Sequence, residues 1–174
     1  MYKLKVLFIL ILILFSSNSF GQWSIVAEDI DEELICMAKN IYFEAGNQPL
    51  AGKLAVSFVT INRVVSSQFP DSVCDVIYQA EYRTNYMGNE VPIIGKCQFS
   101  WFCDGKSDTP TDSYTWIQSM GVAREILEVN NFQINMILID ITEGALWYHA
   151  DYVKPEWSNY LQEIVTIENH IFYK

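Results

Sequence analysis

An apolar pattern of helical spacing that ends in a carboxylate constrains this chain most. Its apolar members recur every three or four residues, as on the buried face of a helix: they are Leu34, Met37, Ala38 and Ile41. Glu44 falls on the same face. Gly46, Asn47 and Pro49 follow, so the helix is predicted to end just after Glu44.

This position makes Glu44 a candidate general acid. Burial disfavours the charged form of a carboxyl, and the negative end of the helix dipole does the same. Both effects raise the pKa of Glu44, and glycoside cleavage needs a carboxyl that is still protonated near neutral pH. The alternative is a structural carboxylate bonded to a backbone amide or an arginine, because structural networks also perturb carboxyl groups.

Short motifs follow Glu44 in a fixed order. They are Gly52, Ala55-Val56, Asn62-Arg63-Val64, Phe69-Pro70, Val73-Cys74, Cys97-Gln98-Phe99-Ser100-Trp101, Cys103-Asp104-Gly105, Gly144-Ala145-Leu146-Trp147-Tyr148-His149-Ala150, Pro155, Trp157 and His170-Ile171-Phe172-Tyr173. In this order and spacing, from about Leu34 to Tyr173, the chain resembles the SleB-type cell-wall hydrolase family, which includes spore cortex-lytic enzymes.

The resemblance implies a fold and an activity. The fold class would be α+β and mainly helical, a lysozyme-like domain with a small β-sheet or hairpins beside the cleft. The activity would be cleavage of peptidoglycan glycan strands, carried out by studied members as lytic transglycosylases. Glu44 aligns with the invariant acid of the family.

The chain departs from the family just after this acid. The family usually reads Glu-Ala-Arg-Gly-Glu-Pro where this chain reads Glu44-Ala45-Gly46-Asn47-Gln48-Pro49. A glutamine cannot exchange a proton near neutral pH. If the second glutamate serves catalysis, this enzyme is impaired or uses another group; if it caps the next helix, Gln48 can replace it.

Polar groups inside two aromatic runs are the candidates for substrate binding. The resemblance places both runs near the cleft, and a sugar site needs stacking faces together with hydrogen-bonding groups. The candidates are Gln98, Phe99, Ser100, Trp101, Tyr148 and His149. A structural, hydrogen-bonded His149 is the alternative, and His170 is expected to be structural. Asp104 and Asp151 are the nearest acids for a two-carboxylate hydrolytic mechanism, although both suit turn capping.

A transglycosylase would not need a second acid, since the sugar's own 6-hydroxyl replaces water. Hydrolysis and transglycosylation therefore both remain open. Two further classes are a non-catalytic peptidoglycan-binding or structural protein on the same fold, and an amidase or peptidase. The latter would require a metal or a nucleophile.

The N-terminus has the pattern of a secretory signal. Lys3 and Lys5 precede the apolar run 6–15, and Ser19 and Gly21 supply the small residues of a cleavage site. We expect a signal peptide at 1–21, a cell-wall hydrolase catalytic domain at 22–174, and export to the periplasm or cell envelope. Contact with a membrane is expected only through this segment, if it stays uncleaved.

The four cysteines predict two disulfides, because an even number in an exported chain is usually oxidised. Cys36, Cys74, Cys97 and Cys103 allow three pairings. A zinc site is disfavoured, since the cysteines lack CxxC spacing and both histidines are distant in sequence. No metal and no cofactor are expected.

The charge balance bears on partners. The net charge of −10 argues against nucleic acid, whose binding rests on basic contacts. It also gives no attraction to peptidoglycan with its acidic stem peptides, so recognition of glycan strands would rest on hydrogen bonds and aromatic stacking. A monomer is expected.

The remaining elements follow from caps, turns and periodicity. We expect a first helix capped by Asp29, a core helix from Pro49, a short helix after Pro70, and a loop or small hairpin at 81–96. We further expect a strand or tight loop at 97–104, a helix capped by Asp112 and ending at 130–131, extended chain at 147–149, and a hairpin at 161–173. The 132–139 segment fits a short helix or a buried strand.

Overall fold

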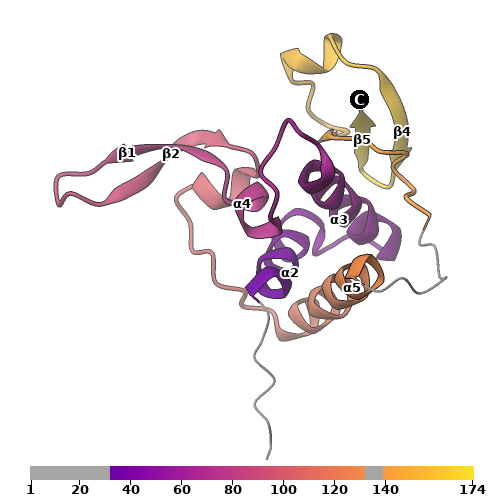
Figure 1. Ribbon diagram of the computed structural model, residues 1–174, viewed down its shortest axis with the longest axis horizontal. Coiled ribbons are helices and arrows are strands. Elements are labelled where there is room, and N and C mark those ends of the chain that lie inside the picture. The colour runs from indigo at the N-terminus through magenta and orange to yellow at the C-terminus, as the bar shows by residue number, and fades with distance from the viewer. Residues whose placement is uncertain (1–31, 132–138) are drawn as a thin grey trace, which may run out of the picture.

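The computed structural model describes residues 32–131 and 139–174 (Figure 1). The expected signal peptide, the expected cap Asp29 and all of the 132–139 segment except Ile139 lie outside the described residues. The helices are α2 (Glu32–Ala45), α3 (Leu50–Val65), α4 (Val73–Ile77), α5 (Ser113–Asn131) and the 3-10 turns η1 (Ser100–Cys103) and η2 (Glu156–Asn159). The strands are β1 (Ala80–Thr84), β2 (Glu90–Cys97), β3 (Trp147–Ala150), β4 (Glu163–Ile167) and β5 (His170–Tyr173).

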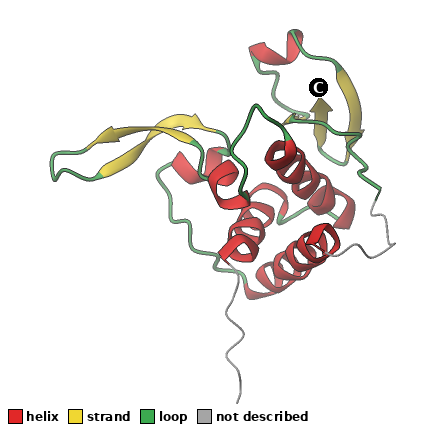
Figure 2. Cartoon of the chain, viewed as in Figure 1, coloured by secondary structure: helices red, strands yellow, loops and turns green. Residues whose placement is uncertain are grey.

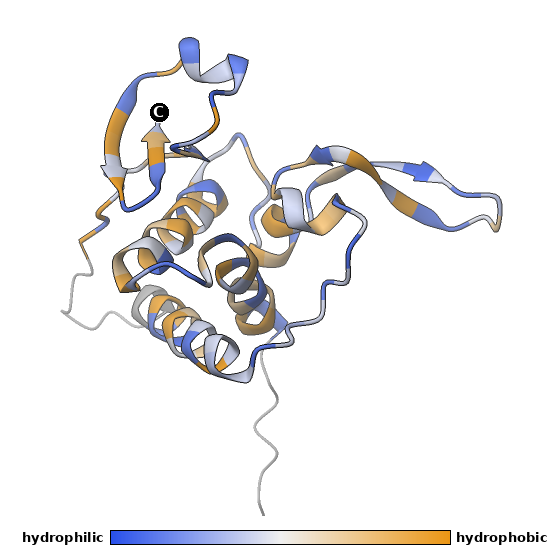
Figure 3. Cartoon of the chain, turned by 180° about the vertical axis from the view of Figure 1, so that it is seen from behind, coloured by the Kyte–Doolittle hydropathy of each residue, from blue (hydrophilic) through white to orange (hydrophobic). Residues whose placement is uncertain are grey.

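The helix α2 packs against α3, α4 and α5 and forms the centre of the helical part (Figure 1). Its predicted apolar face is buried: Leu34, Met37, Ala38 and Ile41 all belong to the main core cluster. The apolar sides of the helices face one another (Figure 3). As predicted, α2 ends at Ala45, one residue after Glu44.

The helix α3 is buried on two sides and joins the helices to the sheet. Phe58 packs in the core with α2 and α4, whereas Ala55 and Val59 pack against Ala145 and Phe172 beside the sheet. Pro49 directly precedes the helix, as predicted. This central position brings the C-terminal turn of α3 between the two parts of the fold.

The C-terminal sheet has the strand order β3-β5-β4, and both pairs are antiparallel (Figure 2). The predicted hairpin is formed by β4 and β5, and the predicted extended segment at 147–149 is β3. The turn before β3 is held by Asp140, whose carboxylate accepts hydrogen bonds from the Thr142 amide, the Gly144 amide and Asn62 Nδ2. Asn62 thereby ties α3 to the start of the sheet.

The strands β1 and β2 form a hairpin that projects away from the helices (Figure 1). The 97–104 segment was expected to be a strand or a tight loop. It is the end of β2 followed by the 3-10 turn η1, so the tight-loop alternative describes most of it. The disulfide Cys97–Cys103 closes this short interval and is compatible with a turn, not with an extended strand.

The second disulfide, Cys36–Cys74, links α2 to α4. The expectation of two disulfides is confirmed, and the pairing that sequence left open is now assigned. Asp112 caps α5 as predicted, since its Oδ1 accepts the amide of Thr115 at 2.7 Å.

The expected mixed fold of helices with a small sheet and a hairpin is confirmed. Within the two described stretches, no helix is long and apolar enough to span a membrane.

Candidate active site

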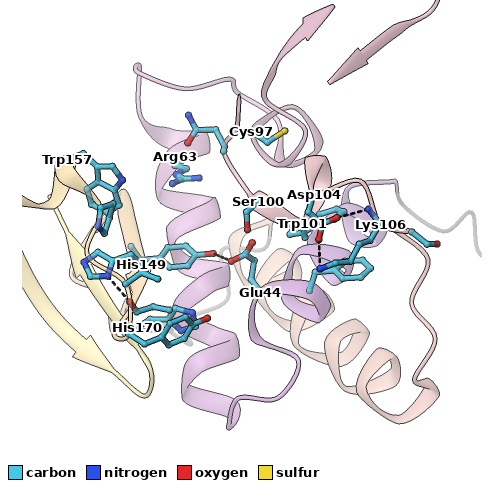
Figure 4. Close-up of a pocket in the computed structure, with 18 residues that line it drawn as sticks. Glu44, Arg63, Cys97, Ser100, Trp101, Asp104, Lys106, His149, Trp157 and His170 are labelled. Carbon is cyan, nitrogen blue, oxygen red and sulfur yellow. Dashed lines mark hydrogen bonds and ion pairs between the residues drawn. The ribbon is translucent and has the colours of Figure 1, made fainter. Parts of the chain in front are cut away.

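A cavity of about 670 Å³ lies between the helices and the C-terminal sheet (Figure 4). One wall comes from the end of α2, the end of α3 and the segment 97–107; the other comes from β3, β5 and the segment 150–157. The predicted site residues that line it are Glu44, Gln98, Ser100, Trp101, Tyr148 and His149. The tertiary fold therefore gathers around Glu44 two motifs that are distant in sequence.

Glu44 projects from the last turn of α2 into this cavity and is half-buried (Figure 4). The Tyr148 hydroxyl donates a hydrogen bond to Glu44 Oε2 at 3.0 Å. Burial raises the pKa of Glu44 above its ordinary value of 4.5, while the hydrogen bond from Tyr148 and the positive charge of Arg63 partly oppose this rise. The net effect is a pKa above the ordinary value, the direction of shift that keeps a carboxyl protonated.

Tyr148 serves Glu44 as a fixed donor. Burial raises the pKa of Tyr148 well above its ordinary value of 10.0, and the nearby negative charge of Glu44 adds to the rise. The hydroxyl thus keeps its proton at any working pH. The ring is held against Phe172 and edge-on to His170, with centroid distances of 5.5 and 5.2 Å.

Arg63 is a cavity residue that sequence reasoning did not select. It lies in the last turn of α3 and is only 4% exposed. Its Nε donates to the Leu146 carbonyl at 2.8 Å, and its guanidinium lies over the rings of Phe69 and Phe99. A signal was present: Arg63 follows Val59 by one helical turn, so the charge falls on an apolar helix face.

Trp101 belongs to the cavity and to the core at once. It is 6% exposed, and its Nε1 donates to Asn40 Oδ1 at 3.0 Å, while Asn40 Nδ2 donates to Thr60 Oγ1. Its ring stacks on Phe43 with centroids 4.8 Å apart. Trp101 thus contributes to the cavity wall while most of its ring is packed in the core.

The neighbours of Trp101 divide between wall and core. Gln98 and Ser100 are exposed and line the cavity. Phe99 was expected to contact substrate, but the structure places it in the core with 2% of its surface exposed, beneath the guanidinium of Arg63. Phe99 therefore supports the site from behind and is not part of the cavity lining.

His149 lines the cavity, and both of its ring nitrogens already have partners. Nδ1 lies 2.9 Å from the Ala150 carbonyl, which can only accept, so Nδ1 carries the proton. Nε2 then accepts from the Tyr173 hydroxyl at 2.9 Å. His170 lines the same cavity, and burial lowers its pKa. Its Nδ1 has no hydrogen-bond partner among the residues that the structure describes.

The two candidate second carboxylates lie in different places. Asp104 lines the cavity at its exposed rim, where Lys106 Nζ lies 3.1 Å from its Oδ2. Hydrogen bonds from Lys106 lower the pKa of Asp104. Asp151 lines an adjoining pocket of about 390 Å³ and not this cavity. Of these two candidates for a second carboxylate, Asp104 is therefore the one that lines the same cavity as Glu44.

Gln48, which stands where the family has its second glutamate, does not line the cavity. Its side chain donates to Asn47 Oδ1 and makes no capping bond to α3. The ammonium of Lys53 instead binds the carbonyls of Gly46 and Gln48 at this junction. Gly46 replaces the family arginine, and a Cβ there would lie 2.3 Å from the Tyr42 carbonyl oxygen, so this junction excludes a side chain.

Between 32 and 131 and between 139 and 174, no three histidine, cysteine or acidic side chains lie together in a way that could hold a metal ion. Glu44 lines the cavity beside aromatic and hydrogen-bonding side chains.

Comparison with known proteins gives the family. The model of the cell wall hydrolase family matches residues 47–173. This chain belongs to the cell wall hydrolase family. The resemblance recognised in the sequence is thereby confirmed. This match begins three residues after Glu44 and does not include it.

Two curated relatives are spore cortex-lytic enzymes. The one from Oceanobacillus iheyensis is 29% identical over 140 residues, which cover 79% of this chain and 40% of the relative. The one from Halalkalibacterium halodurans is 41% identical over 49 residues, 28% of this chain and 15% of the relative. The chain therefore spans less than half the length of these two relatives.

Two solved structures share the fold. The catalytic domain of the Bacillus cereus SleB protein has a TM-score of 0.57 and 25% identity, over 82% of this chain and 89% of that domain. The catalytic domain of the SleB protein from Bacillus anthracis, described as a germination-specific lytic transglycosylase, has a TM-score of 0.59 and 24% identity. That alignment covers 86% of this chain and all of that domain.

Proposed function

We propose that this cell wall hydrolase cleaves the glycan strand of peptidoglycan between N-acetylmuramic acid and N-acetylglucosamine, as a lytic transglycosylase. One observation carries the proposal: a half-buried Glu44 with a raised pKa, hydrogen-bonded by Tyr148, in the wall of an aromatic cavity. The family assignment and the names of the relatives support peptidoglycan as the substrate.

In the first step Glu44 acts as the general acid. Its proton passes to the bridging oxygen, the bond from that oxygen to the anomeric carbon breaks, and the electron pair leaves with the oxygen. Tyr148 keeps the carboxyl oriented by donating to Oε2. General acid catalysis needs a carboxyl that still carries its proton at the working pH, and burial shifts the pKa of Glu44 in that direction.

In the second step Glu44 acts as the base. The sugar's 6-hydroxyl oxygen bonds to the anomeric carbon and gives its proton to the Glu44 carboxylate, which closes a 1,6-anhydro ring. The carboxyl is then protonated again. This cycle needs one carboxyl, which agrees with a cavity whose other acid, Asp104, is ion-paired at the rim.

The substrate-binding roles follow from what each side chain can offer. Trp101 and Phe43 present a stacked aromatic surface. Gln98 and Ser100 are exposed hydrogen-bonding groups beside it. His149 shapes the opposite wall through its bonds to Ala150 and Tyr173. This combination suits a neutral sugar strand better than a charged ligand.

The alternative of a non-catalytic glycan-binding protein drew its support from the lost second glutamate. That support is weak in this structure, because Gln48 does not line the cavity. We further propose that the protein is exported and acts as a monomer in the periplasm or cell envelope, since its proposed substrate lies outside the cytoplasm.

Mass spectrometry of the products from purified peptidoglycan tests the proposal. Transglycosylation gives fragments that end in 1,6-anhydromuramic acid, whereas hydrolysis gives reducing muramic acid, heavier by one water. A hydrolytic product would replace transglycosylation with attack by water, and Asp104→Asn would then be the next variant to examine. An absence of any glycan cleavage would refute the proposed function.

A further inference from the structure

Arg63 is a buried cation, and no carboxylate of the described residues lies at ion-pairing distance from it. The side chain is 4% exposed, and neither ion pair found among residues 32–131 and 139–174 includes it. Its Nη1 is buried and has no hydrogen-bond partner in the described structure. Buried charges are normally paired, so the function of this guanidinium needs a physical explanation.

The surroundings of Arg63 hold the guanidinium in one place. Nε donates to the Leu146 carbonyl at 2.8 Å. The central carbon lies 5.1 Å from the ring centre of Phe69 and 4.9 Å from that of Phe99, so cation–π attraction stabilises the charge from two rings. Phe99, fully buried, thus has a defined role behind the cavity wall.

Arg63 shares its cavity with Glu44 and interacts with it electrostatically. Burial lowers the pKa of Arg63 and the negative charge of Glu44 opposes this effect, while the positive charge of Arg63 in turn lowers the pKa of Glu44. The coupling acts without direct contact, because the pair is not within ion-pairing distance. Its strength therefore depends on the low polarity of the wall.

We propose that Arg63 is the fixed counter-charge for the ionised form of Glu44, a positioning residue that lets one carboxyl both release and recover a proton. This inference rests on the proposed function. When Glu44 protonates the bridging oxygen, a carboxylate is left in a half-buried wall, and Arg63 stabilises it. When the 6-hydroxyl proton returns to Glu44, the original charges are restored. Arg63 itself neither gives nor accepts a proton.

Other groups that can carry charge also face this part of the cavity. From the described elements they are Tyr148 and His149 on β3, His170 on β5, and Asp104 and Lys106 after η1. Raised and lowered pKa values, respectively, keep Tyr148 and His170 neutral near pH 7. Asp104 and Lys106 pair with each other at the exposed rim. Arg63 is therefore the buried positive charge in the described wall.

The test compares Arg63→Gln, Arg63→Lys and the control Arg124→Gln in the full chain. Arg124 is exposed on α5, so its variant makes the same change in net charge away from the cavity. We measure kcat against pH on soluble peptidoglycan fragments, together with the melting temperature. Arg124→Gln should match the unmutated enzyme in both.

Arg63→Gln should lower kcat by about ten- to a hundredfold, less than the roughly 10²–10⁴-fold that the acid–base group itself contributes. Glu44 must be protonated to act, and loss of the positive charge raises its pKa, so the alkaline limb of the profile should move to higher pH. The kcat of Arg63→Lys should match that of the unmutated enzyme at low pH and approach that of Arg63→Gln at high pH. The reason is that a buried ammonium loses its proton far more readily than a guanidinium.

A merely structural role would lower activity without moving the alkaline limb, and that result would overturn the proposal. If Arg63→Gln does not fold, Arg63→Lys decides alone, since a profile parallel to the unmutated one at every pH would also overturn it. Carbon NMR titration of the Glu44 carboxyl needs no substrate and separates the two proposals. An upward shift in Arg63→Gln supports the coupling even if no glycan is cleaved, whereas an unchanged titration refutes it.

Discussion

The substitution Glu44→Gln is the most direct test of the mechanism. Glutamine keeps the volume of the side chain and can still accept the hydrogen bond from Tyr148, but it cannot deliver a proton. General acid–base catalysis contributes roughly 10²–10⁴-fold, so glycan cleavage should fall by at least that factor. In free energy this corresponds to about 3 to 5 kcal/mol of transition-state stabilisation.

The structure also limits the effect on stability. The bond from Tyr148 changes from a charged to a neutral acceptor, which loses about 1 kcal/mol. Removal of a carboxylate that burial disfavours opposes this loss. The melting temperature should therefore stay within about 4 °C of the original, given the typical sensitivity of a chain of this size.

The pH dependence of stability shows whether burial of Glu44 stabilises or destabilises the folded protein. Burial raises the pKa of Glu44 in the folded state above its ordinary value of 4.5. An acid of this kind reduces stability as the pH rises from 4.5 through its folded-state pKa, because the folded protein resists ionisation. Glu44→Gln should thus gain stability relative to the unmutated protein at pH 7 but not below pH 4.5.

The assay measures release of soluble fragments from peptidoglycan, with melting curves at both pH values. Glu128→Gln is a matched control, because it makes the same chemical change at an exposed position on α5. Near-full activity of Glu44→Gln would refute the proposed mechanism. A loss of activity that is matched by unfolding would instead assign Glu44 a structural role.

Three further predictions follow from the cavity and the core. Tyr148→Phe removes a hydrogen-bond donor that lowers the pKa of Glu44. The alkaline limb of the pH–rate profile should therefore move to higher pH, and activity should fall by about tenfold. An alkaline limb at its original pH would contradict this prediction. Thiol titration of the denatured, unreduced protein should find no free thiol, and Cys36→Ser should reduce the free energy of unfolding by about 2–5 kcal/mol in chemical denaturation; two titrating thiols would exclude the pairing. Phe99→Ala should reduce the free energy of unfolding by roughly 3–5 kcal/mol because the ring is fully buried. Unchanged stability together with weaker glycan binding would instead indicate that Phe99 lines the cavity.

Much of the fold follows from local patterns in the sequence. The spacing of Met37 and Ile41, the break at Gly46, and the cap at Asp112 predicted helices that the structure confirms. Such features depend on residues within one or two helical turns, so they can be read without the fold. The same holds for Glu44, whose place at the end of an apolar face needs only the helical period.

The composition of the cavity depends on contacts that the sequence does not encode locally. Tyr148 reaches Glu44 from a strand more than a hundred residues away. Phe99 and Trp101 occupy the same aromatic run, yet one supports the wall from behind and the other forms part of it. Phe99 directly precedes the turn η1 and Trp101 lies within it, so this turn sends the two side chains in different directions. The turn is closed by the disulfide Cys97–Cys103.

The sequence by itself determined the helix that carries the acid, the family pattern and the oxidised state of the cysteines, because each rests on residue type and spacing. Only the tertiary structure decided how the cysteines pair, that Gln48 lies outside the cavity, and that Arg63 lies inside it. The physical reason is that burial and long-range electrostatics depend on which elements pack together. A charge on an apolar helix face acquires its function from the partners that the fold brings to it.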